Sequence, residues 1–290
     1  MKKIVMKAPA KLNLALAVTG LTTGGYHLVD MIMQSVSLYE RVEIVKSSGY
    51  SLTLPQSPVP ANSKNTATKA AKLFFTETGL LAGADITIYK KVPTRAGMAG
   101  GSADAAAVLM GLNQLYGARL TLPQLCKMGA QIGADVPFSI LGGTARASGI
   151  GDILQPLPPP PPCWFTVAMP KGGVSTPIAY AKYDEIGSPV QPNIAAIQTA
   201  IQQGNLANIA ANMQNALEHA NGGERTLQIR KQLDNAGALA SMMTGSGAAV
   251  FGLFANKPTA EAAAKQVEKL APQVFVVQPV AHGPIVEKFI

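Results

Sequence analysis

A run of five consecutive prolines, Pro158 to Pro162, places the firmest constraint on how this chain of 290 residues folds. Consecutive prolines lack amide donors and hold an extended backbone, so neither a helix nor the interior of a sheet continues through them. We therefore predict a connector between an N-terminal domain, 1–157, and a C-terminal domain, 163–290. The alternative is a long surface loop within one domain, because the length suits one large domain or two modest ones.

Local periodicity predicts α+β structure on both sides of the prolines. Alternating apolar residues predict strands, and apolar residues three and four positions apart predict helices, as at Ala67, Ala70, Ala71 and Phe74. Thr121 is a plausible cap for the helix that contains Leu125–Ile132. Strands are expected at 11–19, 37–45, 51–54, 85–89, 164–168, 248–254 and 274–278, and helices across 194–219, 224–235 and 259–270. Because these segments do not alternate as regular βαβ units, we favour two α+β domains over a parallel barrel.

Charge and cysteine content limit the classes of function. The formal net charge of +8 favours anionic ligands, but the basic residues form no long runs and aromatic content is only 6%, which argues against nucleic acid as the main partner. Two cysteines, Cys126 and Cys163, give no disulfide framework and no metal-ligand spacing, so we expect a reduced, cytoplasmic location. The uncharged stretch 236–255 is interrupted by glycine and is better explained as strand, loop and strand than as a membrane span.

The segment "PTRAGMAGGSADAAAVLMGLN", which begins at Pro93, places a glycine-rich loop just before an alanine-rich helix. Glycines allow the backbone to turn and to approach a ligand, and a helix starting near Ser102 points unpaired amides at that ligand. A nucleotide triphosphate suits such a site. Neither G-x-x-x-x-G-K-[ST] nor G-x-G-x-x-G occurs, which argues against a P-loop or a dinucleotide fold. The alternative is a strand-to-helix turn in which glycine only avoids a clash.

Four motifs in order identify a family resemblance. They are "PAKLNL" from Pro9 with "GYH" from Gly25, the glycine loop, "GADVPF" from Gly133 and "MTGSGAAVFGLF" from Met243. The set resembles the GHMP kinases over nearly the whole chain, and especially the branch that acts on a cytidine diphosphate conjugate of methylerythritol. The resemblance implies a two-domain fold: an N-terminal ribosomal-protein-like α/β domain that binds ATP and a C-terminal ferredoxin-like α+β domain that binds the substrate.

The same resemblance implies an ATP-dependent phosphorylation of the 2-hydroxyl of the methylerythritol part of that conjugate, in the non-mevalonate isoprenoid pathway. It implies Mg²⁺ with ATP; no protein carboxylate for the metal is evident, so we expect the ion to arrive on the nucleotide. Backbone amides and this ion can carry the phosphate charge without a P-loop lysine. The residues that the resemblance assigns to ATP are Pro93, Gly97, Ala99, Gly100, Gly101, Ser102 and Ala103, with Asn65 on the adenine side.

By the same match, Asp135 is the catalytic aspartate that accepts or orients the proton of the substrate hydroxyl, and Lys11 is its companion lysine. From the residues alone, Asp135 beside Pro137 fits a local turn bond equally well, and Lys11 fits a solvated strand lysine. Asn65 and Ser102 fit helix caps. Arg95, within the loop, binds a phosphate or lies in solvent.

The resemblance assigns Tyr26, His27 and Tyr180 to the cytidine end of the substrate and Asn13 to its polyol. Aromatic faces suit a planar base, and a neutral imidazole offers one donor and one acceptor to its edge. Without the resemblance, the sequence predicts only that Tyr26 and His27 lie in a half-buried turn after two glycines.

Three alternative functions remain open. The first keeps the fold but phosphorylates mevalonate, phosphomevalonate or homoserine, and the second is a non-catalytic nucleotide-binding regulator. RNA binding driven by the basic balance is the third. On the favoured reading the partners are small molecules, with no nucleic acid or membrane, and the protein is a monomer or homodimer.

Overall fold

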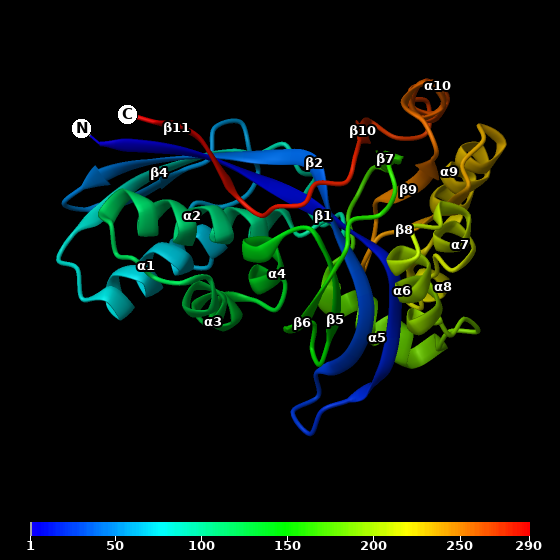
Figure 1. Cartoon of the computed structure of the whole chain (residues 1–290), viewed down its shortest axis with the longest axis horizontal. Helices are drawn as coiled ribbons and strands as arrows, with labels where there is room; N and C mark the ends of the chain where they lie inside the picture. The colour runs from blue at the N-terminus through cyan, green and yellow to red at the C-terminus, as the bar shows by residue number, and fades with distance from the viewer. Residues whose placement is uncertain (1) are drawn as a thin grey trace.

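The computed structural model describes residues 2–290. Within them the chain forms one seven-stranded and one four-stranded sheet, with helices packed on both (Figure 1). The first sheet runs in the order β11-β1-β2-β4-β3, with β5 paired to β2 and β6 to β5. Its strands are β1 (Lys3–Leu21), β2 (His27–Ser47), β3 (Tyr50–Thr53), β4 (Gly83–Tyr89), β5 (Thr144–Ser148), β6 (Ile153–Leu157) and β11 (Ile285–Phe289).

Strands β1 and β2 form the longest antiparallel pair, and they connect the two halves of the molecule. Their pairing shifts register at Pro9/Ala10, Asn13/Ala15 and Val18/Gly20. Such irregularities bend a strand and increase its twist. Figure 1 accordingly shows the two strands curving away from the flat part of the first sheet. Lys11 and Asn13 lie in this irregular part of β1, and both are buried.

Helices cover one face of the first sheet. They are α1 (Thr66–Thr78), α2 (Gly100–Tyr116), α3 (Leu122–Ile132) and α4 (Val136–Leu141). Small side chains of α2 let it lie close to the sheet, because a Cβ at Gly111 would stand 2.5 Å from Ile44. Phe74 of α1 fills the same core and is fully buried. The alanine-rich sequence after the glycine loop is therefore the buried helix that carries the loop.

The second sheet is antiparallel, in the order β10-β7-β9-β8. Its strands and helices are β7 (Trp164–Met169), α5 (Thr176–Ile186), α6 (Ile194–Gln202), α7 (Leu206–Ala211), α8 (Glu218–Asn221), α9 (Glu224–Asn235), β8 (Ala240–Met243), β9 (Val250–Phe254), α10 (Lys257–Val267) and β10 (Gln273–Val277). Strand, helices, strand, strand, helix and strand follow the ferredoxin-like plan. Helices α9 and α10 pack on one face through Leu233 and Ala263.

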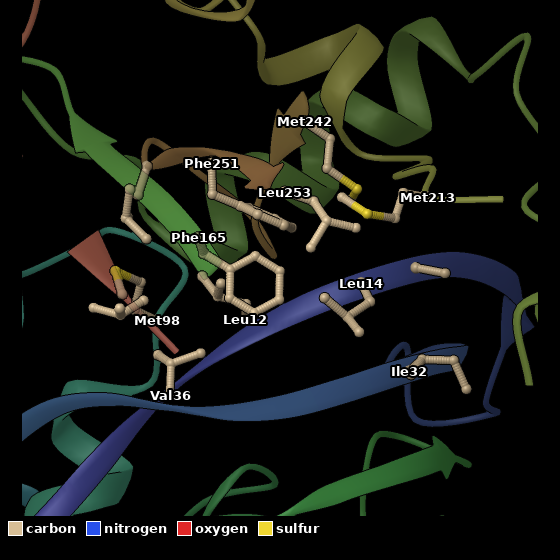
Figure 2. Close-up of a cluster of buried hydrophobic side chains, with 14 of the residues drawn as sticks. Leu12, Leu14, Ile32, Val36, Met98, Phe165, Met213, Met242, Phe251 and Leu253 are labelled. Carbon is tan, nitrogen blue, oxygen red and sulfur yellow. The ribbon is translucent and has the colours of Figure 1, made fainter. Parts of the chain in front are cut away.

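The other face of the second sheet packs directly on β1 and β2, and Figure 2 shows this shared core. Leu12 and Leu14 of β1 lie against the same cluster as Phe165 and Phe251, whose rings meet edge to face at 5.6 Å. All four side chains are buried. This close-packed apolar core holds the two sheets in a fixed position relative to each other.

The proline run contains neither helix nor strand, as expected for consecutive prolines. The chain passes there from the first sheet to the second, but β11 returns at the end to pair with β1. The division into 1–157 and 163–290 stays a prediction, since the first sheet takes its last strand from beyond the prolines. The α+β class of the two halves is confirmed.

Most of the predicted strands and helices are present, with shifted ends. The helical region predicted across 194–219 is present, and it is divided into α6, α7 and the start of α8. Asn205 caps α7 by accepting from the amide of Asn208 at 3.0 Å, directly after Gly204 has turned the chain. The stretch 236–255 is strand, loop and strand as predicted, in β8 and β9. No helix between residues 2 and 290 combines the length and the apolar character that crossing a membrane demands.

Candidate active site

The glycine loop ends in a helix N-terminus that faces a large cleft. Ala99 caps α2 with a left-handed backbone, φ 56°, and makes no side-chain cap bond. The amide of Ala103 already donates to the carbonyl of Ala99 at 2.9 Å, whereas the amides of Gly100, Gly101 and Ser102 precede the first bond of the helix. Three free amides and the positive end of the helix dipole make an anion site.

The glycine loop is joined to the second glycine loop, Thr244–Ala249, by backbone contacts. The amide of Ala248 donates to the carbonyl of Arg95, and that of Ala249 donates to Ala96, both at 3.2 Å. Gly97 has φ 74°, and a Cβ there would stand 2.1 Å from the carbonyl oxygen of Thr244. The two motifs are thus one structural unit, and Gly97 is required where their backbones touch.

Replacing Gly97 with alanine is expected to lower the free energy of unfolding by about 1–3 kcal/mol and to raise the KM for ATP about tenfold. The cost has two parts, the left-handed backbone and the clash with Thr244. Gly79→Ala is the matched control. Gly79 has the same left-handed backbone, with φ 67°, but a Cβ added there meets no atom within 4 Å. Urea unfolding and ATP titration of both variants measure the difference; equal losses would contradict a role for the contact with Thr244.

Lys11 and Asn13 lie side by side on β1 at the floor of the cleft. Lys11 is 5% exposed and Asn13 is fully buried, and the Lys11 ammonium donates a hydrogen bond to Asn13 Oδ1. Gly245 covers them, since a Cβ at that position would stand 3.2 Å from both polar atoms. The alternative of a solvated strand lysine is therefore wrong. Burial lowers the pKa of Lys11, and the negative charge of Asp135 opposes that shift.

Asp135 occupies the N-cap position of α4, but its carboxylate makes no capping hydrogen bond. The local turn bond that the sequence allowed is thus not formed at this helix. The charge of Asp135 acts on both Lys11 and Tyr180, so the carboxylate lies near groups from β1 and from α5. A half-buried carboxylate without a capping role, beside a buried ammonium, can accept a proton or orient a hydroxyl.

The other end of the cleft is aromatic. The ring of Tyr180, on α5, stacks on His27 with centroids 4.4 Å apart, and Tyr183 meets the same imidazole edge-on at 6.4 Å. Burial, with the charge of Asp135, raises the pKa of Tyr180, so this phenol stays neutral. Tyr26 is 68% exposed and free to lie against a flat ligand. The predicted substrate residues Tyr26, His27 and Tyr180 are therefore brought together.

Sequence reasoning missed Asp184, one turn beyond Tyr180 on α5. Its carboxylate contacts His27 Nε2 at 2.7 Å, and both side chains line the cleft. The spacing of Tyr180, Tyr183 and Asp184 places all three on one face of a helix, which is a signal in the sequence. Because no helix was predicted at 176–186, this spacing could not be recognised as one face of a helix.

Asn65 is a helix cap, as the alternative reading of this residue stated. Its side chain accepts from the amide of Ala67 and donates to the carbonyl of Pro60, each at 3.0 Å. It still lines the cleft beside the glycine loop. Ser102 lines it too, and it is not the cap of α2, which is Ala99.

The cleft has a volume of about 1250 Å³. Sites for one small ligand occupy about 300–1,000 Å³, so this cleft is large enough for two substrates. All the predicted site residues line it except Ala103, which is buried inside α2. Arg95 also lines the cleft, from its exposed position in the loop. In the part of the chain that the structure describes, no group of three or more His, Cys, Asp or Glu side chains is placed to hold a metal ion.

A buried charged cluster that the sequence did not reveal lies beneath the start of α2. Lys90 pairs with Glu40 and, at 2.7 Å, with Asp104, while the amide of Lys91 donates to Glu40 at 2.8 Å. Both carboxylates are at least 97% buried, since Glu40 is 0% and Asp104 3% exposed. Burial and the charge of Asp104 raise the pKa of Glu40 to about 7, against the opposing effect of Lys90.

This raised pKa predicts that the Glu40 contribution to stability is fully present below about pH 4.5 and is lost as the pH rises through about 7. Relative to Glu40→Gln, the wild-type free energy of unfolding should fall by about 1–3 kcal/mol across that range. Glu43→Gln is the control, because ion pairs with Lys3 and Arg41 lower the pKa of Glu43, so its contribution changes only at lower pH. Denaturant unfolding from pH 5 to 8 tests this, and parallel curves for wild type and Glu40→Gln would refute it.

Comparison with known proteins adds the family. The model of the GHMP kinases N terminal domain matches residues 65–143, and that of the GHMP kinases C terminal domain matches 197–273. The 4-diphosphocytidyl-2-C-methyl-D-erythritol kinase of Alkaliphilus metalliredigens (strain QYMF) is 38% identical over 96% of this chain and 97% of its own length. That of Caldicellulosiruptor saccharolyticus is 39% identical over 94% of this chain and 96% of its own.

Solved structures agree. A crystal structure of 4-(cytidine 5'-diphospho)-2C-methyl-D-erythritol kinase superposes with a TM-score of 0.80 and 31% identity, over 95% of this chain and 98% of the other. A homoserine kinase from Cytophaga hutchinsonii gives a TM-score of 0.79 over 98% and 97%, but at 20% identity it supports the fold alone.

Proposed function

The chain belongs to the 4-diphosphocytidyl-2-C-methyl-D-erythritol kinases of the GHMP kinase family, ATP-dependent enzymes of the non-mevalonate pathway, and from this premise we propose how its cleft performs the reaction. The phosphoryl group of ATP passes to the 2-hydroxyl of the methylerythritol part of the substrate. The observation that carries the proposal is the position of Lys11 and Asp135, between an amide-lined loop and an aromatic end.

ATP is held along the glycine loop. The free amides of Gly100, Gly101 and Ser102 face the cleft and suit the phosphates, which need donors and positive potential rather than a lysine. Mg²⁺ normally binds through few protein ligands plus substrate phosphates, which fits a site without an all-protein metal cage. When bound, the ion neutralises charge on the phosphates. Arg95 and Asn65 line the same part of the cleft.

Asp135 accepts the hydrogen bond of the substrate hydroxyl and takes its proton as the oxygen attacks phosphorus. Lys11 places a positive charge near that carboxylate and stabilises the negative charge that develops on the oxygen. The hydrogen bond to Asn13 and the close approach of Gly245 hold the ammonium at the floor of the cleft. The cytosine end lies at Tyr26, His27 and Tyr180, and Asn13 contacts the polyol.

The test measures ADP release with Mg-ATP and, in parallel, the cytidine conjugate, mevalonate and homoserine, with Asp135→Ala as control. Turnover only with the cytidine conjugate, lost in the variant, is the expected result. Turnover with another acceptor would replace the proposed substrate. Bound ATP without turnover on all three would mean a regulator instead.

A further inference from the structure

The imidazole of His27 is held on two sides by a single helix. Tyr180 stacks on its face and Tyr183 meets its edge, and the Asp184 carboxylate contacts Nε2 at 2.7 Å. The His27 side chain is only 12% exposed, while that of Asp184 is 50% exposed. These contacts hold the ring in one orientation, and its Nε2 atom is already engaged by Asp184, which has no role in the proposed reaction.

The chemistry of that contact fixes the proton on the ring. A carboxylate has lone pairs but no proton to give, so Nε2 must carry the hydrogen and donate it to Asp184. In a neutral imidazole the other nitrogen, Nδ1, is then an acceptor. No hydrogen bond from Nδ1 to any of the described residues is formed, and His27 lines the cleft. An acceptor is thus left for a ligand.

Cytosine and uracil differ at this kind of contact. Cytosine carries an exocyclic amine, which donates, at the position where uracil carries a carbonyl oxygen, which accepts. An imidazole nitrogen that accepts can form a hydrogen bond with the cytosine amine. Opposite the uracil carbonyl, the lone pairs of the two acceptors repel each other. A buried polar group left without a partner costs more than an ordinary hydrogen bond contributes, so the mismatch gives discrimination.

We propose that Asp184 is a positioning residue that determines base specificity: by holding His27 with its hydrogen on Nε2, it presents Nδ1 as an acceptor for the cytosine amine and excludes uracil. The inference rests on the proposed function, because it places the cytosine beside His27. Asp184 itself touches neither base nor phosphate and acts only through the imidazole.

The experiment compares kcat/KM for the cytidine diphosphate conjugate with that for its uridine analogue, in wild type and Asp184→Asn. An asparagine side chain can offer either its oxygen or its amine to Nε2, so it no longer selects one tautomer. The cytidine preference is expected to fall about tenfold or more, mainly through KM, because the base lies away from the reacting hydroxyl.

Two further variants separate specificity from charge and structure. Glu185→Gln removes the same charge from the neighbouring, exposed position of α5 and should leave the preference unchanged. Asp184→Glu keeps a carboxylate and should restore most of the preference. Nitrogen-15 chemical shifts of the imidazole supply an independent readout, with His27→Gln identifying the signal among the three histidines of the chain.

In wild type those shifts should show hydrogen on Nε2 alone, and in Asp184→Asn a shift toward Nδ1. An unchanged cytidine preference in Asp184→Asn would overturn the proposal, as would a doubly protonated His27 in the active wild type. Wild type that fails to phosphorylate the cytidine conjugate at all would instead overturn the proposed function, so the two failures are distinguishable.

Discussion

Asp135→Asn is expected to lower kcat by about 10²–10⁴-fold, the usual contribution of a positioned general base. Asparagine has nearly the same shape and keeps an oxygen for the substrate hydroxyl, but it cannot take the proton. Since the carboxylate makes no capping bond with α4, the change should leave the fold and the affinity for ATP nearly intact. Steady-state ADP release gives kcat, and ATP titration by fluorescence or calorimetry gives the affinity.

The matched control is Asp85→Asn. Asp85 lies on β4 in the same half of the molecule, is exposed and bonds only Ser51 at 2.5 Å, so its loss should not change turnover. A kcat of Asp135→Asn within twofold of wild type would contradict the assignment of the base. A loss that accompanies unfolding would be revealed by circular dichroism, and Asp135→Glu, which keeps the carboxylate, would then serve as the second variant.

Local patterns predicted the elements that depend on local interactions. Helix α3 begins where Thr121 and Gln124 form a capping box, and α1 buries the stripe through Phe74, because both signals lie within a few turns. The alternation of Ile86 and Ile88 similarly predicted β4. The side chains of both isoleucines are buried. In these segments the same residues determine the backbone and its contact with the core, so the sequence is sufficient.

Long-range pairing was not predictable in the same way. Strand β11 has no buried side chain, and only its pairing with β1 makes it a strand. Helix α5 has a weak apolar stripe with Ala179 as its one buried residue among those described, so its periodicity gave no signal. The contact of Asp184 with His27 depends on that helix, and the cluster of Glu40, Lys90 and Asp104 joins β2, the chain after β4 and α2.

Lys11 shows the same limit within the predicted site. The alternation on β1 predicted a strand, and the family resemblance predicted a partner for Asp135. Neither could give the burial of the ammonium, because burial comes from Gly245 and the second glycine loop, which reach β1 only in the folded chain. The environment of Lys11 is therefore what the structure adds, and it changes what the lysine is expected to do.

Lys11→Met is accordingly expected to lower kcat by about 10²–10³-fold, the effect of removing one group that stabilises the charge developing in the transition state. Methionine fills a similar volume without the charge. The matched control is Lys7→Met on the same strand, where the lysine is 41% exposed and pairs with Glu287 at 2.8 Å. That variant should keep wild-type turnover, and equal kcat values for both variants and wild type would contradict the role of Lys11.

A pH profile then distinguishes a charged Lys11 from one that only fills space. Burial lowers the pKa of Lys11 below the 10.5 of a free lysine, so the folded enzyme loses the ammonium at lower pH than a solvent-exposed lysine does. If the charge is needed for the transfer, kcat should decline on the alkaline side before pH 10.5 is reached, and the decline should be absent from the residual activity of Lys11→Met. A methionine variant with the same alkaline decline would assign that limb to another group and remove the electrostatic role of Lys11.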